Sequence, residues 1–494
     1  MTLTILVGYL LLVLSIGLWS HRRAQSTGED WFVASRTIGS FVLLMTLFGT
    51  HMTSFALLGS SGESYRVGIG VFTLMASSSA LVAPLVFFFL GTRVWAIGKR
   101  HGLLTQVQFV RARWQSESLA LLLFCVLVLL LVPYLLIGVM GAGITLNQIT
   151  EGAVPPWVGS FVVSGVVLSY VSAGGMRGTA WVNTFQTTLF MILGGVTAVV
   201  IVGKLGGLEP AMLQLSELRP ELLIRGAAME PVRVLSYSFI PLSVGMFPHI
   251  FTHWLSAEKA ATFRAPIILY PLCIAAVWLP MVTLGVLGHL DFPGLIGPEA
   301  NELLIRQIAL HAPGILAGLL GAGVFAAIMS SLDSQSLSLA TMFTQDVVRR
   351  SVLRRGKQMS ERAQILSGRL FVLAVVGVTF AISLVARPSI FGLGVWSFSG
   401  YAALLPVLIA ALYWRRSTAA GATAAVLTVI ASWVYFFVQA RAEPGYSVLG
   451  TGVMPVAVMF FASAAVLIAV SLLTEPPPRA VVDGFVGLGR AQER

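Results

Sequence analysis

Charged residues are scarce in this sequence. Asp, Glu, Lys and Arg together make up only 10% of its 494 residues, whereas roughly 25% is typical of a soluble domain. Cysteine is also rare: Cys125 and Cys273 both lie inside apolar stretches, which argues against a disulfide framework or a cysteine metal site. The sequence contains no HExxH motif, no paired carboxylates and no Ser, His and Asp set at comparable depth. We therefore do not expect an enzyme.

Long apolar stretches take the place of these features. Apolar residues make up 57% of the chain and occur in blocks rather than in an amphipathic pattern. About 20 apolar residues in a helix cross a hydrocarbon core of roughly 30 Å. The sequence thus predicts an all-α polytopic membrane protein in contact with the lipid bilayer. We expect thirteen transmembrane helices, at residues 2–19, 38–60, 69–97, 117–150, 156–173, 178–203, 233–256, 265–288, 314–345, 365–386, 390–413, 418–439 and 450–473.

The positive charge follows the order of these spans. The net charge is +11, and the basic residues gather in short clusters between apolar spans, such as Lys99-Arg100 and Arg349-Arg350. Such clusters are typical of the cytoplasmic loops of membrane proteins. We expect a protein of the inner (cytoplasmic) membrane with its N-terminus outside and its C-terminus inside. This distribution excludes a nucleic-acid partner, and no obligate protein partner is evident.

Two predicted spans contain sequences that weaken a helix at mid-membrane. The second span reads Gly49-Thr-His-Met-Thr-Ser54, and the seventh carries Pro241 followed by Gly245-Met-Phe-Pro-His249. Backbone groups freed at that depth must line protein or a polar cavity, because lipid cannot satisfy them. For either span considered alone, the simpler alternative is a Gly or Pro kink that serves only helix packing.

Their matched positions favour a transport site. The two spans are five apart, so each begins one of two five-helix units, and an odd number of helices inverts the second unit in the membrane. We predict a core of two inverted five-helix repeats with broken helices in spans 2 and 7. The corresponding parts are a first helix and cytoplasmic loop (1–37), a first repeat (38–203), an external loop (204–232), a second repeat (233–413), two peripheral helices (414–473) and a cytoplasmic tail (474–494).

The ninth span carries the most informative polar residues. Small and hydroxyl side chains recur at three- and four-residue intervals along one face: Ala327, Ser330, Ser331, Ser334 and Ser338. Such a face suits close helix packing, but it also offers the neutral oxygens that an alkali cation prefers. Asp333 lies on the same span, and a carboxylate inside a membrane is costly unless it is paired, protonated or bound to an ion.

The order and spacing of several motifs resemble the sodium:solute symporter family over roughly residues 3–420. The resemblance rests on Gly62-Glu-Ser-Tyr65-Arg-Val-Gly68, Gly98–Thr105 with Arg111 and Arg113, Gly174-Gly175-Met-Arg177 with Trp181 and Gln186, Ala326–Ser331, and Pro406 followed by Tyr413-Trp414-Arg-Arg416. Members of this family have the LeuT-type inverted-repeat core. The resemblance implies symport of a small-molecule solute with Na⁺ as the co-transported ion.

The same resemblance implies a sodium site between spans 2 and 9. In the family this site uses backbone carbonyls of the broken second span and an Ala-x-x-Ser-Ser/Thr motif in the ninth. Carried over, its ligands are the carbonyls of Gly49, Met52 and Ala327 and the hydroxyls of Ser330 and Ser331.

Some relatives have a second ion site with an Asp in span 6, and this sequence departs from that pattern. Trp181-Val-Asn183-Thr-Phe-Gln186 has an amide where that Asp would stand, while Asp333 stands where some relatives have a hydroxyl. Our hypothesis is that the negative charge has moved across the site, so that Asn183, Asp333 and Ser334, with Ser330, form a cation or proton site. The alternative is that Asp333 is protonated or bonded to Asn183 and has a structural role.

Substrate sites in such folds lie at mid-membrane, between the broken helices and their neighbours. The candidates are Thr50, His51, Thr53, Tyr134, Phe247, His249, Trp396, Ser399 and Tyr401. These residues provide aromatic walls, hydroxyls and imidazoles but no Arg or Lys, which suits a small organic anion held near the sodium charge. The Phe-Pro-His segment also resembles the pantothenate and monocarboxylate branches of the family. A neutral polar solute, a proton-driven carrier and a sensor with a transporter fold remain alternatives.

Overall fold

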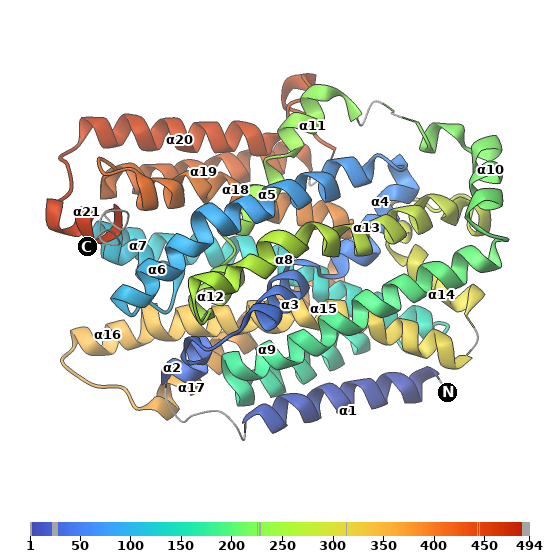
Figure 1. The fold of residues 1–494 in the computed structure, drawn as a ribbon, viewed down its shortest axis with the longest axis horizontal. Coiled ribbons are helices and arrows are strands. Elements are labelled where there is room, and N and C mark those ends of the chain that lie inside the picture. The colour runs from blue at the N-terminus through green and yellow to red at the C-terminus, as the bar shows by residue number, and fades with distance from the viewer. Residues whose placement is uncertain are drawn as a thin grey trace.

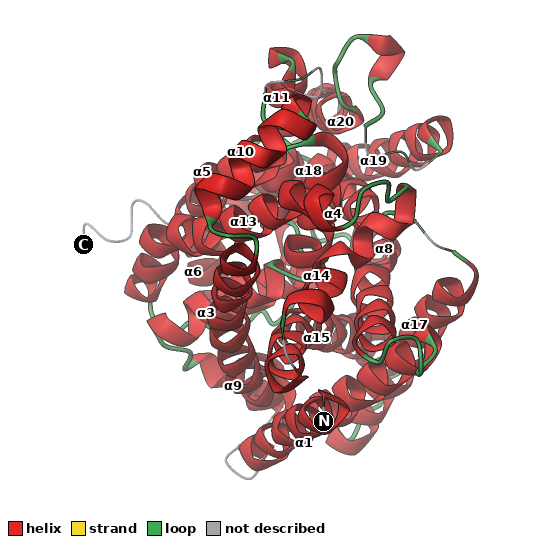
Figure 2. Cartoon of the chain, turned by 90° about the vertical axis from the view of Figure 1, so that its right-hand side faces the viewer, coloured by secondary structure: helices red, strands yellow, loops and turns green. Residues whose placement is uncertain are grey.

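The computed structural model describes residues 2–21, 28–224, 226, 229–312, 314–386, 388–441, 443 and 445–486. Within these ranges the chain is helical, and the only β feature is an isolated bridge between Ile38 and Ala257. The all-α prediction is confirmed. The long helices lie roughly side by side, with α1 (Thr2–His21) along one edge of the bundle and α20 (Pro455–Leu473) along the opposite edge (Figures 1 and 2).

Nine helical units in the described ranges are long and apolar enough to cross a membrane. They are Phe72–His101, Glu117–Ile149, Gly174–Lys204, Ala260–Asp291, Gly314–Arg354, Glu361–Val385, Ile390–Tyr413, Ala419–Ala440 and Pro455–Leu473. Two bent helix pairs raise this number to eleven, and the shorter apolar helices Thr2–Gly17 and Pro156–Val171 fall on predicted spans 1 and 5. The count of thirteen spans stays a prediction.

The two bent pairs fall on the second and seventh predicted spans. α3 (Ser40–His51) is followed by a π-helical turn, Phe55–Gly59, and by α4 (Ser60–Val67), with a bend of 58° between Ser40–His51 and Phe55–Val67. α11 (Pro231–Tyr237) and the 3₁₀ turn Ile240–Gly245 are followed by α12 (Pro248–Ser256), with a bend of 50°. The chain leaves the helix at Met52 and at Phe247, whose backbone is extended before Pro248.

Spans 5 and 6 are joined more tightly than the sequence indicates. α9 runs from Pro156 to Lys204 without a separate loop, and the chain turns at Gly175, where φ is 54° and ψ is −152°. A Cβ at Gly175 would lie 2.7 Å from the carbonyl oxygen of Trp31. Only glycine adopts this backbone conformation readily, and only glycine fits beside Trp31.

Several short helices occupy regions that we expected to be loops or tail. They include α2 (Gly28–Val33), α7 (Gln106–Trp114), α10 (Leu208–Leu218), α14 (Leu303–His311) and α21 (Arg479–Val486). Within the predicted tail, the Phe485 ring of α21 packs against His101 and Phe109, at 5.2 and 5.3 Å between centroids. Residues 22–27 of the predicted first loop and 487–494 of the tail lie outside the described residues.

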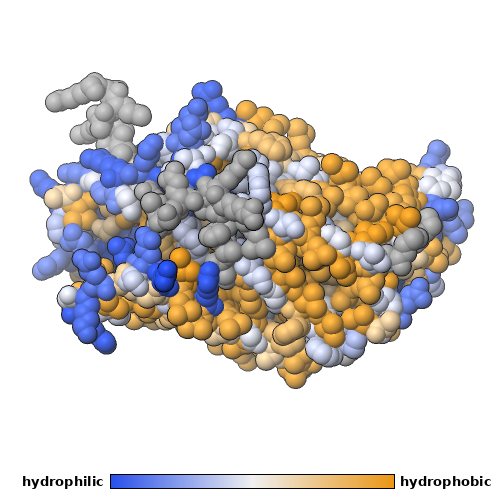
Figure 3. Space-filling model, turned by 90° about the horizontal axis from the view of Figure 1, so that it is seen from below, coloured by the Kyte–Doolittle hydropathy of each residue, from blue (hydrophilic) through white to orange (hydrophobic). Residues whose placement is uncertain are grey.

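The remaining long elements complete the bundle. The helices that run along its length are α8 (Glu117–Ile149), α13 (Arg264–Asp291), α15 (Gly314–Met342), α17 (Glu361–Val385), α18 (Ile390–Tyr413) and α19 (Ala419–Ala440). α5 (Ser78–Val86) and α6 (Thr92–His101) belong to one span, Phe72–His101. α15 is almost fully buried over its C-terminal two thirds, as expected for a central helix. Polar side chains gather at the two ends of the molecule and apolar ones between them (Figure 3).

Candidate functional site

The end of α3 meets the serine face of α15. The Ser330 hydroxyl lies 3.0 Å from the carbonyl oxygen of Gly49 and 3.0 Å from that of Ala327. A hydroxyl has one proton, so it donates to only one of these carbonyls at a time. Three oxygens therefore converge at a fully buried position, where the helix of span 2 ends. The geometry brings together three of the five atoms predicted to bind sodium.

The other two predicted ligands are the Met52 carbonyl and the Ser331 hydroxyl, and the Ser331 hydroxyl is turned toward its own helix. Met52 is the first residue beyond α3, and its sulfur accepts a hydrogen bond from the Trp278 indole, at 3.3 Å. The Ser331 hydroxyl donates to the carbonyl of Ile328, one turn earlier in α15, at 3.0 Å. Both are buried.

Close packing explains why position 49 is a glycine. A Cβ there would lie 1.8 Å from the Thr187 hydroxyl oxygen and 3.5 Å from Oδ1 of Asn183. Thr187 belongs to α9 and donates to the carbonyl of Met45, so α9 packs directly on the backbone of α3. Gly49 thus permits a close approach of the two helices beside the Ser330 oxygens.

Asp333 is fully buried among neutral hydrogen-bond donors. Tyr170 donates to one carboxylate oxygen at 3.0 Å, while Asn183 and Ser334 donate to the other at 3.2 and 3.1 Å. The structure brings Asn183, Asp333 and Ser334 together, as the hypothesis of a relocated charge requires. Within the described part of the chain, the donors to this carboxylate are all neutral, and Oδ1 of Asn183 has no hydrogen-bond partner there.

Thr50 joins this cluster rather than an aromatic cavity. Its hydroxyl donates to Ser334 Oγ at 2.8 Å and accepts from the Asn183 amide at 3.2 Å. His253 of α12 lies beside the same groups, with Nε2 3.3 Å from Ser334 Oγ. Both broken spans thus reach the polar face of α15.

Five of the other predicted solute residues gather in an aromatic cluster next to these groups. Phe247 stacks on His249 at 5.1 Å between ring centroids, and lies 5.3 Å from Tyr134 and 5.0 Å from Tyr401. His51 is 5.9 Å from Phe247, and its Nδ1 lies 2.5 Å from the Tyr270 hydroxyl. The Tyr134 hydroxyl donates to the carbonyl of His51 at 3.1 Å, so this ring also holds the end of α3.

Three predicted solute residues lie elsewhere. Trp396 packs on Phe437 of α19 at 5.4 Å, and it lines a small gap with Ser399 and Tyr446 on the side facing the peripheral helices. Ser399 donates to the carbonyl of Val395, one turn back in its own helix. Thr53 lies in the break after α3, 3.4 Å from the Ser54 hydroxyl. Trp396 and Ser399 share a face of α18 opposite the aromatic cluster.

Sequence reasoning missed four residues of the two clusters: Tyr170, His253, Tyr270 and Phe398. Phe398 contacts Tyr134, Phe247 and Phe55 at 4.9, 5.2 and 5.1 Å. His253 follows His249 by four residues, so the two imidazoles are on neighbouring turns of α12. That spacing was a usable signal. Tyr170 and Tyr270 lie in uniformly apolar spans and carried none.

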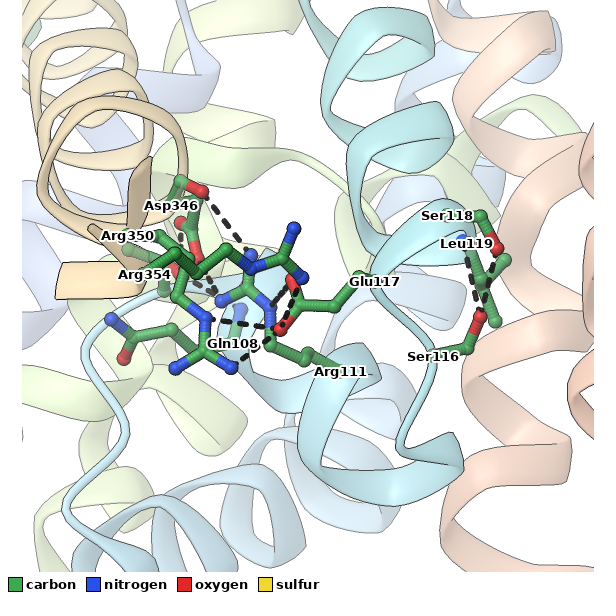
Figure 4. Close-up of polar contacts among 10 residues, drawn as sticks. Gln108, Arg111, Ser116, Glu117, Ser118, Leu119, Asp346, Arg350 and Arg354 are labelled. Carbon is green, nitrogen blue, oxygen red and sulfur yellow. Dashed lines mark hydrogen bonds and ion pairs between the residues drawn. The ribbon is translucent and has the colours of Figure 1, made fainter. Parts of the chain in front are cut away.

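A network of ion pairs joins three elements at one end of the bundle (Figure 4). Arg111 of α7 donates to Asp346 at 2.8 Å and to Glu117 at 3.0 Å. Glu117, the first residue of α8, also accepts from Arg350 and Arg354 of α16 (Arg349–Arg354) at 2.7 and 3.3 Å. Thr105 donates to the second oxygen of Asp346 at 2.7 Å. The network ties α7 and the start of α8 to the end of span 9.

Two bent spans whose breaks meet a polar central helix are typical of secondary membrane transporters. The sodium:solute symporter family model matches residues 31–428. The chain belongs to the sodium:solute symporter family.

Similar proteins agree with this assignment. The chain is 27% identical over 432 residues to the sodium/pantothenate symporter of Escherichia coli (strain K12), covering 85% of this chain and 87% of that one. It is 24% identical over 485 residues to the high-affinity proline transporter PutP of Bacillus subtilis (strain 168), covering 96% and 98%. A solved Na⁺-coupled sialic acid symporter has the same fold, with a TM-score of 0.78 at 16% identity over 97% of this chain and 98% of that one.

Proposed function

We propose that this protein couples the inward movement of Na⁺ to the uptake of a small organic anion, by alternating access across the cytoplasmic membrane. The observation that carries the proposal is the convergence of the Gly49 and Ala327 carbonyls on the Ser330 hydroxyl at the end of a broken span. Neutral oxygens at such a break are what a dehydrated alkali cation needs in place of water. Met52 and Ser331 complete the proposed site, Ser331 by turning its hydroxyl away from the carbonyl of Ile328.

The Asp333 cluster is proposed as a second cation or proton site. Its carboxylate has neutral donors only, and the Asn183 carbonyl oxygen next to it has no partner within the described residues. A bound Na⁺ or a proton would offset the cost of a buried negative charge. A proton-driven carrier is therefore the second candidate function, and it uses the same residue.

The solute is proposed to bind among His51, Tyr134, Phe247, His249 and Tyr401. These rings supply apolar walls, and the two imidazoles supply hydrogen bonds. Thr50, placed in the Asp333 cluster, links this region to the ions through Ser334. Trp396, Ser399 and Thr53 contribute indirectly at most, because their contacts lie outside the aromatic cluster.

Coupling follows from the shared backbone of α3. A sodium ion held by the Gly49 carbonyl fixes the end of this helix, and the next two residues, Thr50 and His51, belong to the Asp333 cluster and the solute region. Each ligand then strengthens the binding of the other by the same factor, as thermodynamic linkage requires. Each positive charge carried inward gains about 2.3 kcal/mol per 100 mV of membrane potential.

The direction of uptake rests on the proposed orientation, with the N-terminus outside. The end that carries the basic clusters of α6 and α16 would face the cytoplasm. Single cysteines placed in α10 or α16 test this orientation. When intact cells are treated with a membrane-impermeant thiol reagent, only the cysteine in α10 is expected to react.

The deciding experiment is uptake into proteoliposomes with sodium and pH gradients imposed independently, over a panel of small carboxylates and neutral polar solutes. We expect a sodium gradient alone to drive accumulation of a carboxylate. Ser330→Ala should raise the sodium concentration for half-maximal uptake by about tenfold, because it removes a buried hydroxyl ligand worth ~1 kcal/mol or more. Equal accumulation with a proton gradient and no sodium would overturn the sodium assignment in favour of the proton-driven carrier.

A matched pair of serine variants sharpens the test. Ser331→Ala should also weaken sodium dependence, whereas Ser463→Ala, a buried serine of α20 outside both clusters, should leave it unchanged. Sodium-dependent thermal stabilisation of the purified protein gives an independent reading, because a ligand that binds only the folded state raises its stability.

A further inference from the structure

The short tail helix α21 is anchored to the ends of α18 and α20. Arg416, which follows α18, donates to the carbonyls of Leu472 and Thr474 at 3.2 and 2.7 Å, so the end of α20 is held against the end of α18. Arg415 pairs with Asp483 of α21 at 3.0 Å, between exposed side chains. The start of the tail therefore belongs with α18 and α20.

The far end of α21 reaches a different group of helices, beside α6 and α7 (Figure 1). The Phe485 ring is buried against His101, the last residue of α6, and against Phe109 of α7. His101 Nε2 also lies 3.3 Å from the carbonyl oxygen of Gly484. Val482, one turn before Phe485, is buried too, so α21 turns an apolar face to the bundle.

This second group includes the inner half of a broken span. The Phe109 ring packs on Phe251 of α12 as well, at 5.6 Å between ring centroids, so it lies between the tail and α12. α6 also holds α12, because the Trp95 indole donates to the carbonyl of Ala257 at 2.7 Å. α6, α7 and α12 therefore pack as one unit, and Phe485 of the tail rests on it.

Release of a solute toward the cytoplasm requires the inner halves of the two broken spans, α3 and α12, to move away from α15. These two halves are tied together: Ile38, just before α3, donates to the carbonyl of Ser256 and accepts from the amide of Glu258, at 3.2 and 3.0 Å. Thr252 of α12 lies with its hydroxyl 3.5 Å from that of Ser338 in α15, so the helices are in contact there. A movement that breaks this contact carries α6 and α7 away from the anchored side of the tail.

We propose that α21 is a strap that holds the cytoplasmic side of the protein closed. It stays anchored to α18 and α20, and its Phe485 ring docks on the unit of α6, α7 and α12 and leaves that unit when the side opens. This inference rests on the orientation and the alternating access of the proposed function, and it adds a control on the inward-open state. A contact that exists in only one of two states shifts the equilibrium toward that state. The strap therefore lowers the population of the inward-open state, and its detachment raises it.

Exposure of the path beside α12 tests the strap. In a protein whose Cys125 and Cys273 are replaced by alanine, Thr252→Cys reports the separation of α12 from α15 through its rate of alkylation by a water-soluble maleimide. In lipid nanodiscs, Phe485→Ala should raise this rate about tenfold, because it truncates the buried aromatic anchor of the contact. Arg479→Ala changes an exposed residue of the same helix and should leave the rate unchanged.

A cross-link tests the opposite direction. A Cβ on Gly484 would lie 3.5 Å from the His101 ring, so His101→Cys with Gly484→Cys lets a short, reducible thiol cross-linker fix the strap on α6. Amide hydrogen exchange of residues 248–256 should slow severalfold with this cross-link and recover on reduction, because exchange needs local opening. The matched control joins Arg415→Cys to Asp483→Cys, which ties the tail only to its anchored side, and should leave the exchange unchanged.

Three results overturn the inference. The first is equal alkylation in Phe485→Ala and Arg479→Ala, and the second is exchange at α12 that the cross-link to His101 does not slow. The third is a parallel rise in the alkylation of Ser463→Cys, buried in α20, because this would show a general loosening of the protein. Neither measurement uses a sodium gradient or a solute, so these results leave the proposed function standing, and only the uptake experiment overturns that.

Discussion

Asp333 and Asp346 are two buried carboxylates on one continuous helical run, and their surroundings differ in kind. Asp346 accepts from the Arg111 guanidinium at 2.8 Å and from Thr105 at 2.7 Å, so its charge is paired. Asp333 accepts from a phenol, an amide and a hydroxyl, all neutral. The charge of the first carboxylate is balanced, whereas the described residues offer the second no positively charged partner.

This difference indicates a structural role for Asp346 and a ligand-binding role for Asp333. A permanent guanidinium makes Asp346 part of the contact between α7 and the end of span 9, and such a pair is costly to break from one side. A carboxylate surrounded by neutral donors instead leaves room for a partner that arrives and departs, which is what a transport cycle requires.

The largest expected effect belongs to Asp333→Asn. A charge contact at about 4 Å in a protein environment is worth up to about 4 kcal/mol, so its loss should raise the cation concentration for half-maximal uptake at least tenfold. Asp346→Asn is the matched control and should leave this concentration within about twofold. Initial uptake rates over a sodium titration measure both. Unchanged sodium stoichiometry and affinity in Asp333→Asn would assign that residue a structural role.

Arg111→Met tests the paired carboxylate. It leaves Asp346 buried without its cation, so the free energy of unfolding should fall by about 3 kcal/mol. The double variant Arg111→Met with Asp346→Leu removes both charges and should recover more than half of that loss. Denaturant unfolding in detergent measures the three proteins, and a double variant no more stable than the single one would contradict the pairing argument.

Gly49→Ala tests how tightly α9 approaches the Ser330 oxygens. The added methyl group overlaps the Thr187 hydroxyl, and overpacking of this kind costs about 1–3 kcal/mol. Thr187→Ala in the same protein should relieve part of the cost and restore part of the sodium affinity. If Gly49→Ala bound sodium as the wild type does, the close packing would have no bearing on the site.

Arg350→Ala should have the smallest effect. The Arg350 side chain is 46% exposed and shares Glu117 with Arg111 and Arg354. Exposed ion pairs contribute about 0–1 kcal/mol, so unfolding should change by less than that and sodium affinity should not change. A loss as large as that of Arg111→Met would show that the network acts as one unit.

The sequence predicted the helical architecture because apolar blocks report membrane spans directly. The bends of 58° and 50° lie in the two spans that Gly49 and the pair Pro241 and Pro248 had marked. Helix ends were less accurate: the span predicted at 314–345 continues in the structure to Arg354, because its last turns are polar and hold the ion pairs. A search for apolar stretches cannot locate the end of a helix whose last turns are polar.

The residues around the candidate site were predicted unevenly for a similar reason. Ser330, Asn183 and Asp333 stand out as polar residues in apolar spans, and the structure brings Ser330 to Gly49 and Asn183 to Asp333. Trp396 and Ser399 were selected by residue type, yet helix rotation turns them toward α19. Which face of a largely apolar helix points inward depends on packing, and α18 has no charged residue that would mark one face.

The turn at Gly175 has a mechanical consequence. Spans 5 and 6 are two helices that meet at a kink, where Gly175 has non-helical dihedral angles and lies against Trp31. A connection of one residue leaves little length of chain to absorb a relative displacement of the two helices. A movement of the arm that carries Asn183 and Thr187 must therefore be taken up at Gly175 or passed to the arm that carries Tyr170.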